Sequence, residues 1–185
     1  MSEPTVRSTD PLIELRRDLH RHPEPAWREF YTTARIVEEI RRIGVDELYV
    51  GKDVTAGPRV GVPDEDVLRE WFERAEDAGA DPELLASMDG GHTGAVAVLR
   101  RDEGPTVGLR VDIDALPREE STDANHAPAA GGFRSETGAM HACGHDAHAA
   151  IGVGVLEAVT ESDFAGTLKV FFQPAEEVIG GGEAM

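Results

Sequence analysis

Apolar residues recur at helical spacing through the first part of the chain, and each run starts or stops at a typical boundary residue. Asp10 and Pro11 suit an N-cap followed by the first helical residue, and Gly44 is a typical helix end. Residues 51–63 are rich in Gly and Pro and are expected to form a loop. The pattern predicts helices over about 10–22, 32–43 and 64–78, at most a short helix over 82–88, and a disordered lead-in over 1–9.

The pattern changes to short β-rich runs after residue 92. Residues 93–100 and 106–113 are separated by a charged turn, and this spacing favours two strands that neighbour each other in a sheet. A small-residue helix is expected over 147–159, and residues 168–172 read as a further buried strand. Residues 121–140 show no periodicity and are expected to form a long loop. This order of elements predicts an α/β fold in which helices flank a sheet.

Acidic residues dominate the charge of the chain. It carries 36 Asp and Glu against 18 Lys and Arg, a formal net charge of −18 with His counted as neutral. That sign excludes a broadly basic nucleic-acid surface, and no apolar run approaches the roughly 18 residues that cross a bilayer. The single Cys excludes an internal disulfide framework, and we expect no secretory signal. We therefore expect a salt-adapted (halophilic), cytosolic protein, with an ordinary acidic protein as the alternative.

Residue types that bind metals are concentrated in the segment 140–148, which reads MHACGHDAH. Cys thiolate and His imidazole are good ligands for borderline divalent cations. Cys143 and His145 are separated by Gly144, which allows a sharp turn that aims both side chains at one point. The alternative is a buried Cys beside surface His residues.

Two pairs of carboxylates accompany the predicted strands. Glu176 and Glu177 follow the strand at 168–172, at an edge where α/β proteins place their sites. In a metal site, one carboxylate can ligate the cation while the other takes a proton from water. Asp112 and Asp114 alternate along a strand and share a face, from which a carboxylate can orient an imidazole ligand. The alternative for both pairs is a solvated surface.

These motifs occur together in one order along the chain. The strings are LHRHPE at 19–24, RVDIDALP at 110–117, MHACGHDAH at 140–148 and FFQPAEE at 171–177. The combination resembles the metal-dependent amidohydrolases of the M20 metallopeptidase class, in the branch of aminoacylase-like enzymes, hippurate hydrolases and auxin-conjugate hydrolases. A loop-helix insert at about 51–92 is similar to the A-subunit branch of the p-aminobenzoyl-glutamate hydrolases. The resemblance implies a zinc-peptidase-like catalytic domain.

The resemblance also implies a site with two divalent metal ions. Manganese is the usual cation in this branch, with zinc or nickel as alternatives. The matched motif positions make Glu176 the general base and acid, and make Asp114 the Asp that orients the metal chemistry. Three positions match metal ligands, namely Cys143, His145 and Glu177. Four further residues lie in the same motifs with their roles left open, namely Asp112, His141, Asp146 and His148.

The implied reaction is hydrolysis of the amide bond of an N-acyl or N-aroyl amino acid, and the implied partners are a second copy or a paralogous B-type subunit. The family carries two further His ligands after its Glu pair, whereas all seven His of this chain precede Glu176. We therefore expect residues 1–185 to be the N-terminal portion of a catalytic domain, incomplete at its C-terminus and without the lid or dimerisation domain. The alternatives are a Cys–His acyl transferase built on Cys143 and an inactive fragment or non-catalytic, partner-binding subunit.

Overall fold

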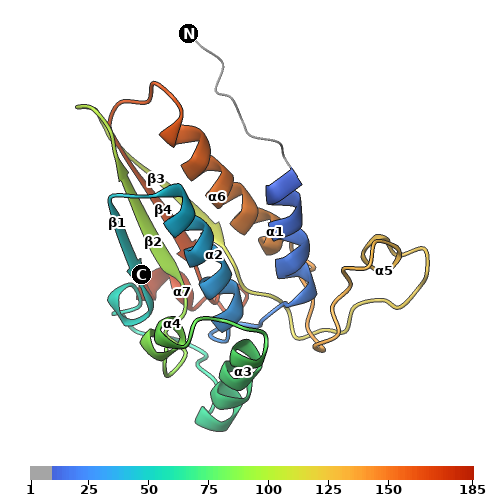
Figure 1. Ribbon diagram of the computed structural model, residues 1–185. Helices are drawn as coiled ribbons and strands as arrows, with labels where there is room; N and C mark the ends of the chain where they lie inside the picture. Colours follow the sequence, from blue (N-terminus) through green and yellow to red (C-terminus); the bar gives the residue numbers. More distant parts are fainter. Residues whose placement is uncertain (1–9) are drawn as a thin grey trace.

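The computed structural model describes residues 10–185, so the lead-in expected over 1–9 lies outside the described residues. It shows the expected α/β fold, a four-stranded sheet flanked by helices (Figure 1). The strands are β1 (Glu47–Val50), β2 (Ala95–Arg100), β3 (Thr106–Asp112) and β4 (Thr167–Gln173). The helices are α1 (Asp10–Arg21), α2 (Phe30–Ile43), α3 (Glu65–Asp77), α4 (Pro82–Ser87), α5 (Ala127–Ala130), α6 (His145–Thr160) and α7 (Gly181–Ala184), with a 3₁₀ turn at Gly51–Asp53.

The strands lie in the order β1-β2-β4-β3, so the expectation that β2 and β3 are neighbours is wrong. β4 lies between them, antiparallel to β2 and parallel to β3. The reason is the distribution of apolar residues: Val170 and Phe172 of β4 are fully buried, whereas the first half of β3 is exposed and suits an edge. The short connection 101–105 passes over the start of β4, since Thr167 donates its backbone N–H to the carbonyl of Pro105.

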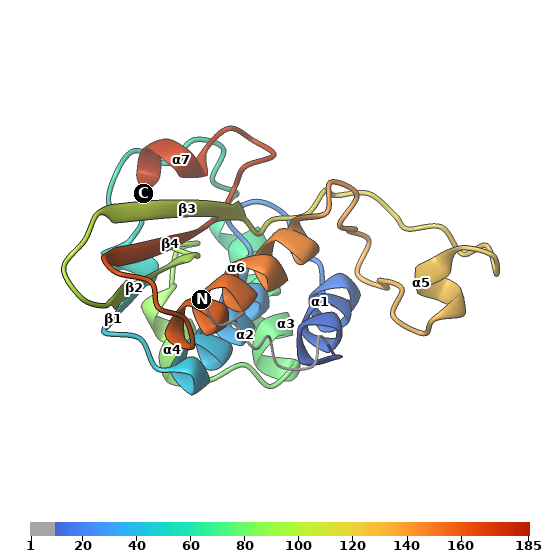
Figure 2. The same ribbon diagram turned by 90° about the horizontal axis from the view of Figure 1, so that it is seen from above.

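Three helices form a layer on one side of the sheet. Figure 2 shows α1, α2 and α6 on this side and α7 on the other. α6 packs against β3 and β4, and α2 packs against β2. Side chains such as Leu156, Ile36 and Phe172 are fully buried between the layers, and burial of each contributes roughly 1.5–3 kcal/mol. The predicted helices are confirmed, with α2 and α6 starting slightly earlier than expected.

Strand β1 was not anticipated from the sequence. It has four residues, too few for an alternating pattern to be read. It forms because it pairs antiparallel with the free edge of β2, with Leu48 opposite Ala97.

The connection from β3 to α6 extends away from the sheet and carries α5 at its far end (Figure 2). Its base is closed by a pair of backbone hydrogen bonds between Leu116 and Met140, at 3.1 and 3.0 Å. This closure returns the chain to the end of β3, so that the segment 141–145 starts α6 beside Asp112 and Asp114. Over the described range, 10–185, no helix is both long enough and apolar enough to cross a membrane.

Candidate metal centre

The metal-ligand residue types meet at one edge of the sheet. β3 and β4 run parallel, so the segments that follow their C-terminal ends lie side by side. Asp112 ends β3 and Asp114 follows it, and Glu176 and Glu177 follow β4. The crossover helix α6 begins with His145, which places its imidazole at the same edge. The topology therefore collects side chains from three separate stretches of sequence.

His145 is held by Asp114 in one orientation. Its Nδ1 lies 2.9 Å from the backbone oxygen of Asp114 and 3.2 Å from Oδ1 of the same residue. A carbonyl oxygen only accepts, so Nδ1 carries the proton and Nε2 is the nitrogen available to a metal. Burial opposes charging of the ring, but the hydrogen bond to Asp114 and the charges of Asp112 and Asp114 raise the pKa of His145 to about 9. Without a cation, Nε2 is therefore also protonated at neutral pH, and a cation bound at Nε2 would displace this second proton.

The Glu pair offers two partly exposed carboxylates, and one oxygen of Glu177 is buried. The side chain of Glu176 is 41% exposed, and its Oε2 lies 3.8 Å from Nε2 of His145. The backbone N–H of Glu177 donates to Oδ2 of Asp114 at 2.9 Å, so Asp114 fixes both His145 and Glu177. Oε1 of Glu177 is buried and has no hydrogen-bond partner among the described residues. Ligand atoms of His145, Glu176 and Glu177 lie within 4.8 Å of one another, so this donor set fits a divalent cation.

Cys143 is exposed at the same centre. A hydrogen bond to Glu177, slight burial and the charges of Glu177, Glu176 and Asp114 raise the pKa of its thiol to about 11. A nucleophilic Cys needs the opposite shift, toward the thiolate. The ring nitrogens of His141 have no partner among the described residues, and Nδ1 of His145 is bonded to Asp114. This environment disfavours the Cys–His acyl transferase and suits a thiol that is ionised by a bound cation.

Asp112 and His148 form a second group beside the first. Ligand atoms of Asp112, His145 and His148 also lie within 4.8 Å of one another. Nδ1 of His148 is hydrogen-bonded to Oδ1 of Asp112, which also accepts a contact from Nε2 of His145 at 3.5 Å. Both groups need Nε2 of His145, because Nδ1 is bonded to Asp114. One cation can therefore use His145, and a second would need other ligands.

His141 and Asp146, the remaining candidates, do not join the centre. His141 is 5% exposed, and burial lowers its pKa to about 4, so the ring is neutral at neutral pH. Asp146 instead contacts Arg16 and His20 on α1, with Oδ2 at 2.7 Å from Nε of Arg16.

Glu29 is a buried residue that no sequence motif indicated. Its carboxylate accepts the backbone N–H of Ala175 at 2.8 Å and the hydroxyl of Thr93 at 2.6 Å. Ala175 has a φ of 52°, an unusual value for a residue with a side chain, directly before Glu176. Glu29 therefore holds the turn that presents the Glu pair. The contact joins the start of α2 to the end of β4, and no local pattern indicates it.

Comparison with known proteins gives one consistent result. Residues 108–185 match the family model of peptidase family M20/M25/M40. The indole-3-acetyl-aspartic acid hydrolase of Enterobacter agglomerans is 43% identical over 179 residues, which are 94% of this chain and 41% of that protein. The A subunit of the p-aminobenzoyl-glutamate hydrolase of Escherichia coli (strain K12) shows the same identity and coverage. The chain thus spans 41% of the length of these two curated relatives.

Solved structures agree with the sequence matches. The aminobenzoyl-glutamate utilization protein from Klebsiella pneumoniae superposes with a TM-score of 0.76 at 36% identity, over 96% of this chain and 39% of that one. A dinuclear metal binding peptidase of Bacillus subtilis from the M20 family gives a TM-score of 0.61 at 33% identity, over 93% of this chain and 36% of that one. Motif order, sequence similarity and fold agree: residues 108–185 match peptidase family M20/M25/M40, and the chain is similar to hydrolases and to a peptidase of the M20 family over more than 90% of its length.

Proposed function

We propose that this chain contributes part of a metal-dependent amidohydrolase that cleaves N-acyl or N-aroyl amino acids. The observation that carries the proposal is the convergence of ligand atoms of His145, Glu176 and Glu177, with the Cys143 thiol near enough to Glu177 for that carboxylate to raise its pKa. The names of two relatives, an indole-3-acetyl-aspartic acid hydrolase and a p-aminobenzoyl-glutamate hydrolase, support the substrate class. Each substrate joins an aromatic acyl group to an acidic amino acid through an amide.

The proposed roles follow from exposure and hydrogen bonding. Cys143, His145 and Glu177 would hold a divalent cation, and Asp114 orients two of them through the contacts described above. When bound, the cation supplies Lewis-acid activation of water and of the substrate carbonyl. Glu176, whose side chain is 41% exposed, accepts the proton of the attacking water. The oxygen of that water adds to the amide carbon, the C–N bond breaks, and the same carboxylate gives the proton to the leaving amine. Because water attacks the carbonyl directly, no covalent acyl-enzyme forms.

We further propose manganese as the cation, with zinc or nickel as alternatives, and two ions in the complete enzyme. A thiolate, an imidazole and carboxylates together suit borderline divalent cations, and the Bacillus subtilis relative is described as dinuclear. Residues 1–185 act here as one portion of a catalytic domain, with the insert at about 51–92 typical of the A-subunit branch. Pairing with a second copy or with a B-type subunit, a cytosolic location and adaptation to salt remain predictions from the sequence.

The alternative function is a non-catalytic, partner-binding subunit or inactive fragment. One observation favours it: both candidate ligand groups in the described chain share the single free nitrogen of His145. A two-metal centre needs more ligands than that arrangement offers.

Metal binding and amide hydrolysis test the proposal together. The chain should bind Mn²⁺ weakly and hydrolyse p-aminobenzoyl-glutamate poorly, because both candidate ligand groups of the described residues share one nitrogen of His145. Cys143→Ala should lower Mn²⁺ affinity, while Glu176→Gln should leave the affinity nearly unchanged. In a longer version that contains the remaining ligands, Glu176→Gln should abolish turnover at full metal content. If calorimetry gives the same Mn²⁺ affinity for wild type and Cys143→Ala, Cys143 is not a ligand. If Glu176→Gln keeps full activity in the longer version, Glu176 is not the general base.

A further inference from the structure

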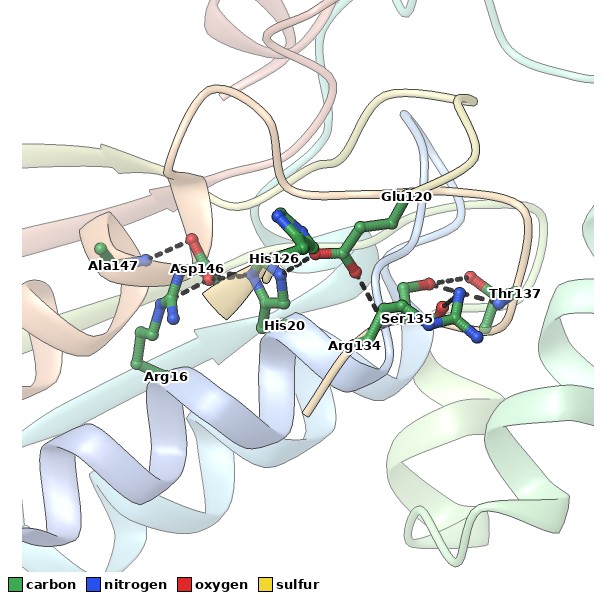
Figure 3. Close-up of polar contacts among 9 residues, drawn as sticks. All are labelled: Arg16, His20, Glu120, His126, Arg134, Ser135, Thr137, Asp146 and Ala147. Carbon is green, nitrogen blue, oxygen red and sulfur yellow. Dashed lines mark hydrogen bonds and ion pairs between the residues drawn. The ribbon is translucent and has the colours of Figure 1, made fainter. Parts of the chain in front are cut away.

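His20 lies between two buried carboxylates, outside the candidate metal centre (Figure 3). Its Nδ1 is 2.7 Å from Oδ2 of Asp146, and its Nε2 is 2.9 Å from Oε1 of Glu120. His20 is 3% exposed, and the side chains of both acids are 0% exposed. An ionised carboxylate only accepts hydrogen bonds, so both ring nitrogens of His20 donate. Nη2 of Arg16 also lies 3.3 Å from Nδ1 of His20, but a guanidinium only donates, and the shorter contact with Asp146 sets the role of Nδ1. The ring is therefore an imidazolium that bridges two anions.

Other groups around this bridge complete the hydrogen bonding of the two carboxylates. Arg16, also on α1, places Nε 2.7 Å from Oδ2 of Asp146, and Oδ1 of Asp146 accepts the backbone N–H of Ala147 at 2.9 Å. On the side of the long connection, Glu120 accepts from the backbone N–H of Ser135 at 2.6 Å and contacts Nε2 of His126 at 2.7 Å.

Two further rings face His20. Phe133 approaches edge-on with ring centroids 5.5 Å apart, and the neutral His141 ring lies at 6.4 Å. Neither supplies a negative charge, so Asp146 and Glu120 are the anions that stabilise the charged imidazole. Burial opposes that charge, but the hydrogen bonds and charges of the two acids raise the pKa of His20 above its ordinary value.

The bridge joins three segments that are far apart in the sequence. His20 lies in the last turn of α1, Glu120 in the connection from β3 to α6, and Asp146 in the first turn of α6. Asp146 directly follows His145, whose Nε2 faces the carboxylates of the candidate centre. Through Asp146, α1 therefore holds the helical turn that carries His145.

We propose that His20 is a positioning residue of the metal centre: its imidazolium ties Asp146 and Glu120 together and thereby fixes the first turn of α6, which presents His145. The inference rests on the proposed function, because it concerns that same centre. It adds a residue that contacts no candidate ligand and acts through Asp146. Removal of the imidazolium leaves each buried carboxylate without the cation that joins it to the other, which loosens both the helix start and the connection.

The protonation state is measured first, and it does not depend on metal. Two-dimensional ¹H–¹⁵N spectra of the chain, with His20 assigned by its absence in His20→Gln, should show both ring nitrogens protonated at neutral pH. The ring should lose its proton only above the ordinary pKa of His. The pattern of a neutral tautomer at neutral pH would overturn the bridging imidazolium.

The positioning role is measured by Co²⁺ titration, followed by the thiolate-to-cobalt absorption band and by affinity. His20→Gln should bind Co²⁺ about tenfold more weakly or worse, the range seen when a supporting partner of a ligand is lost. His22→Gln is the matched control on the same helix, because His22 pairs with Asp18, away from the centre, and it should bind like wild type.

The double variant His20→Gln/Glu120→Gln separates positioning from a failure to fold. The amide introduced at position 20 can donate one N–H to Asp146, while its oxygen accepts from the amide introduced at position 120. The hydrogen bonds are then complementary without a charge at position 20 or 120. This variant should fold and recover most of the Co²⁺ affinity. Wild-type affinity and band position in folded His20→Gln, or weak binding by the folded double variant, would overturn the proposal. No Co²⁺ binding by wild type would refute the proposed metal function, and the positioning role with it, while the NMR result stands separately.

Discussion

Asp114 illustrates how single residues build the candidate centre. Its backbone oxygen and Oδ1 hold His145, and its Oδ2 accepts the backbone N–H of Glu177. The alternation of Asp112 and Asp114 along a strand was readable from the sequence, and so was the expectation that one of them orients an imidazole. The contact with Glu177 was not readable, because it depends on β4 lying beside β3.

We expect Asp114→Asn to lower the affinity of the chain for Mn²⁺ by about 10- to 100-fold, since an Asn side chain has one acceptor oxygen for two N–H groups. Calorimetric titration measures this. Asp163→Asn, at an exposed position, is the control and should bind like wild type. Unchanged affinity in a folded Asp114→Asn would mean that the carboxylate of Asp114 is not needed, and that the backbone oxygen of this residue is enough to hold His145.

Glu29→Ala should lower the free energy of unfolding by about 2–4 kcal/mol, because it leaves the N–H of Ala175 and the hydroxyl of Thr93 unpaired in the interior. Urea denaturation measures the change. Glu38→Ala is the control: Glu38 pairs with Arg35 on the surface of α2, and its loss should change stability by less than about 1 kcal/mol. Equal effects of the two substitutions would contradict the role of Glu29.

Asp18 should make stability depend on acid pH. Burial opposes its charge, but hydrogen bonds from His22, Arg35 and Tyr31 lower the pKa of this carboxyl to about 2 in the folded chain. The stabilisation is therefore complete above the ordinary pKa of 3.8 and is lost as the pH falls toward 2. Asp18→Asn should be less stable than wild type at neutral pH, and the difference should shrink across that acid window. A difference that stays constant with pH in thermal melts would contradict this assignment.

At the scale of elements, the packing of α6 on the sheet decides the position of the centre. The composition of short runs indicated this helix and both strands that it connects, because a few neighbouring residues carry that signal. The strand order was predicted wrongly, because the short charged turn indicated that β2 and β3 were adjacent. What decides the order is burial: the apolar β4 occupies an interior position, and the exposed first half of β3 lies at the edge.

Gly152 sets how closely α6 approaches the sheet. A Cβ at this position would lie 2.8 Å from a ring carbon of Phe172 and 3.0 Å from a methyl of Val111. We expect Gly152→Ala to lower the free energy of unfolding by about 1–3 kcal/mol through overpacking, despite a gain of about 1 kcal/mol in helix propensity. Gly154→Ala is the control on the same helix, because its Cβ meets only the movable end of Leu12. It should be neutral or stabilising, and a larger loss there would contradict the packing argument.

At the scale of the whole molecule, the net charge of −18 is the dominant feature. Ion pairs such as Arg69 with Glu65 and Arg74 with Glu70 lie at exposed positions and contribute little each. The excess acidic side chains therefore repel one another and oppose compaction, and dissolved ions should reduce this repulsion.

Low concentrations of salt should stabilise the folded chain. The screening length falls from about 30 Å at 0.01 M to about 8 Å at 0.15 M, so most of the gain should occur in this interval. We expect the free energy of unfolding to rise by about 1 kcal/mol or more, measured by urea denaturation in KCl. A rise that begins only at molar salt would indicate preferential exclusion of the salt and would contradict screening.

The sequence by itself determined the features that a few neighbouring residues encode. These are the amphipathic helices, the strands ending in carboxylates, and the Cys143-Gly144-His145 spacing typical of a metal site. Only the tertiary structure decided which distant groups meet. His20 and Asp146 are 126 positions apart, and Glu29 and Ala175 are 146 positions apart. Such contacts depend on strand order and helix packing, which follow from burial summed over the whole chain and leave no local pattern to read.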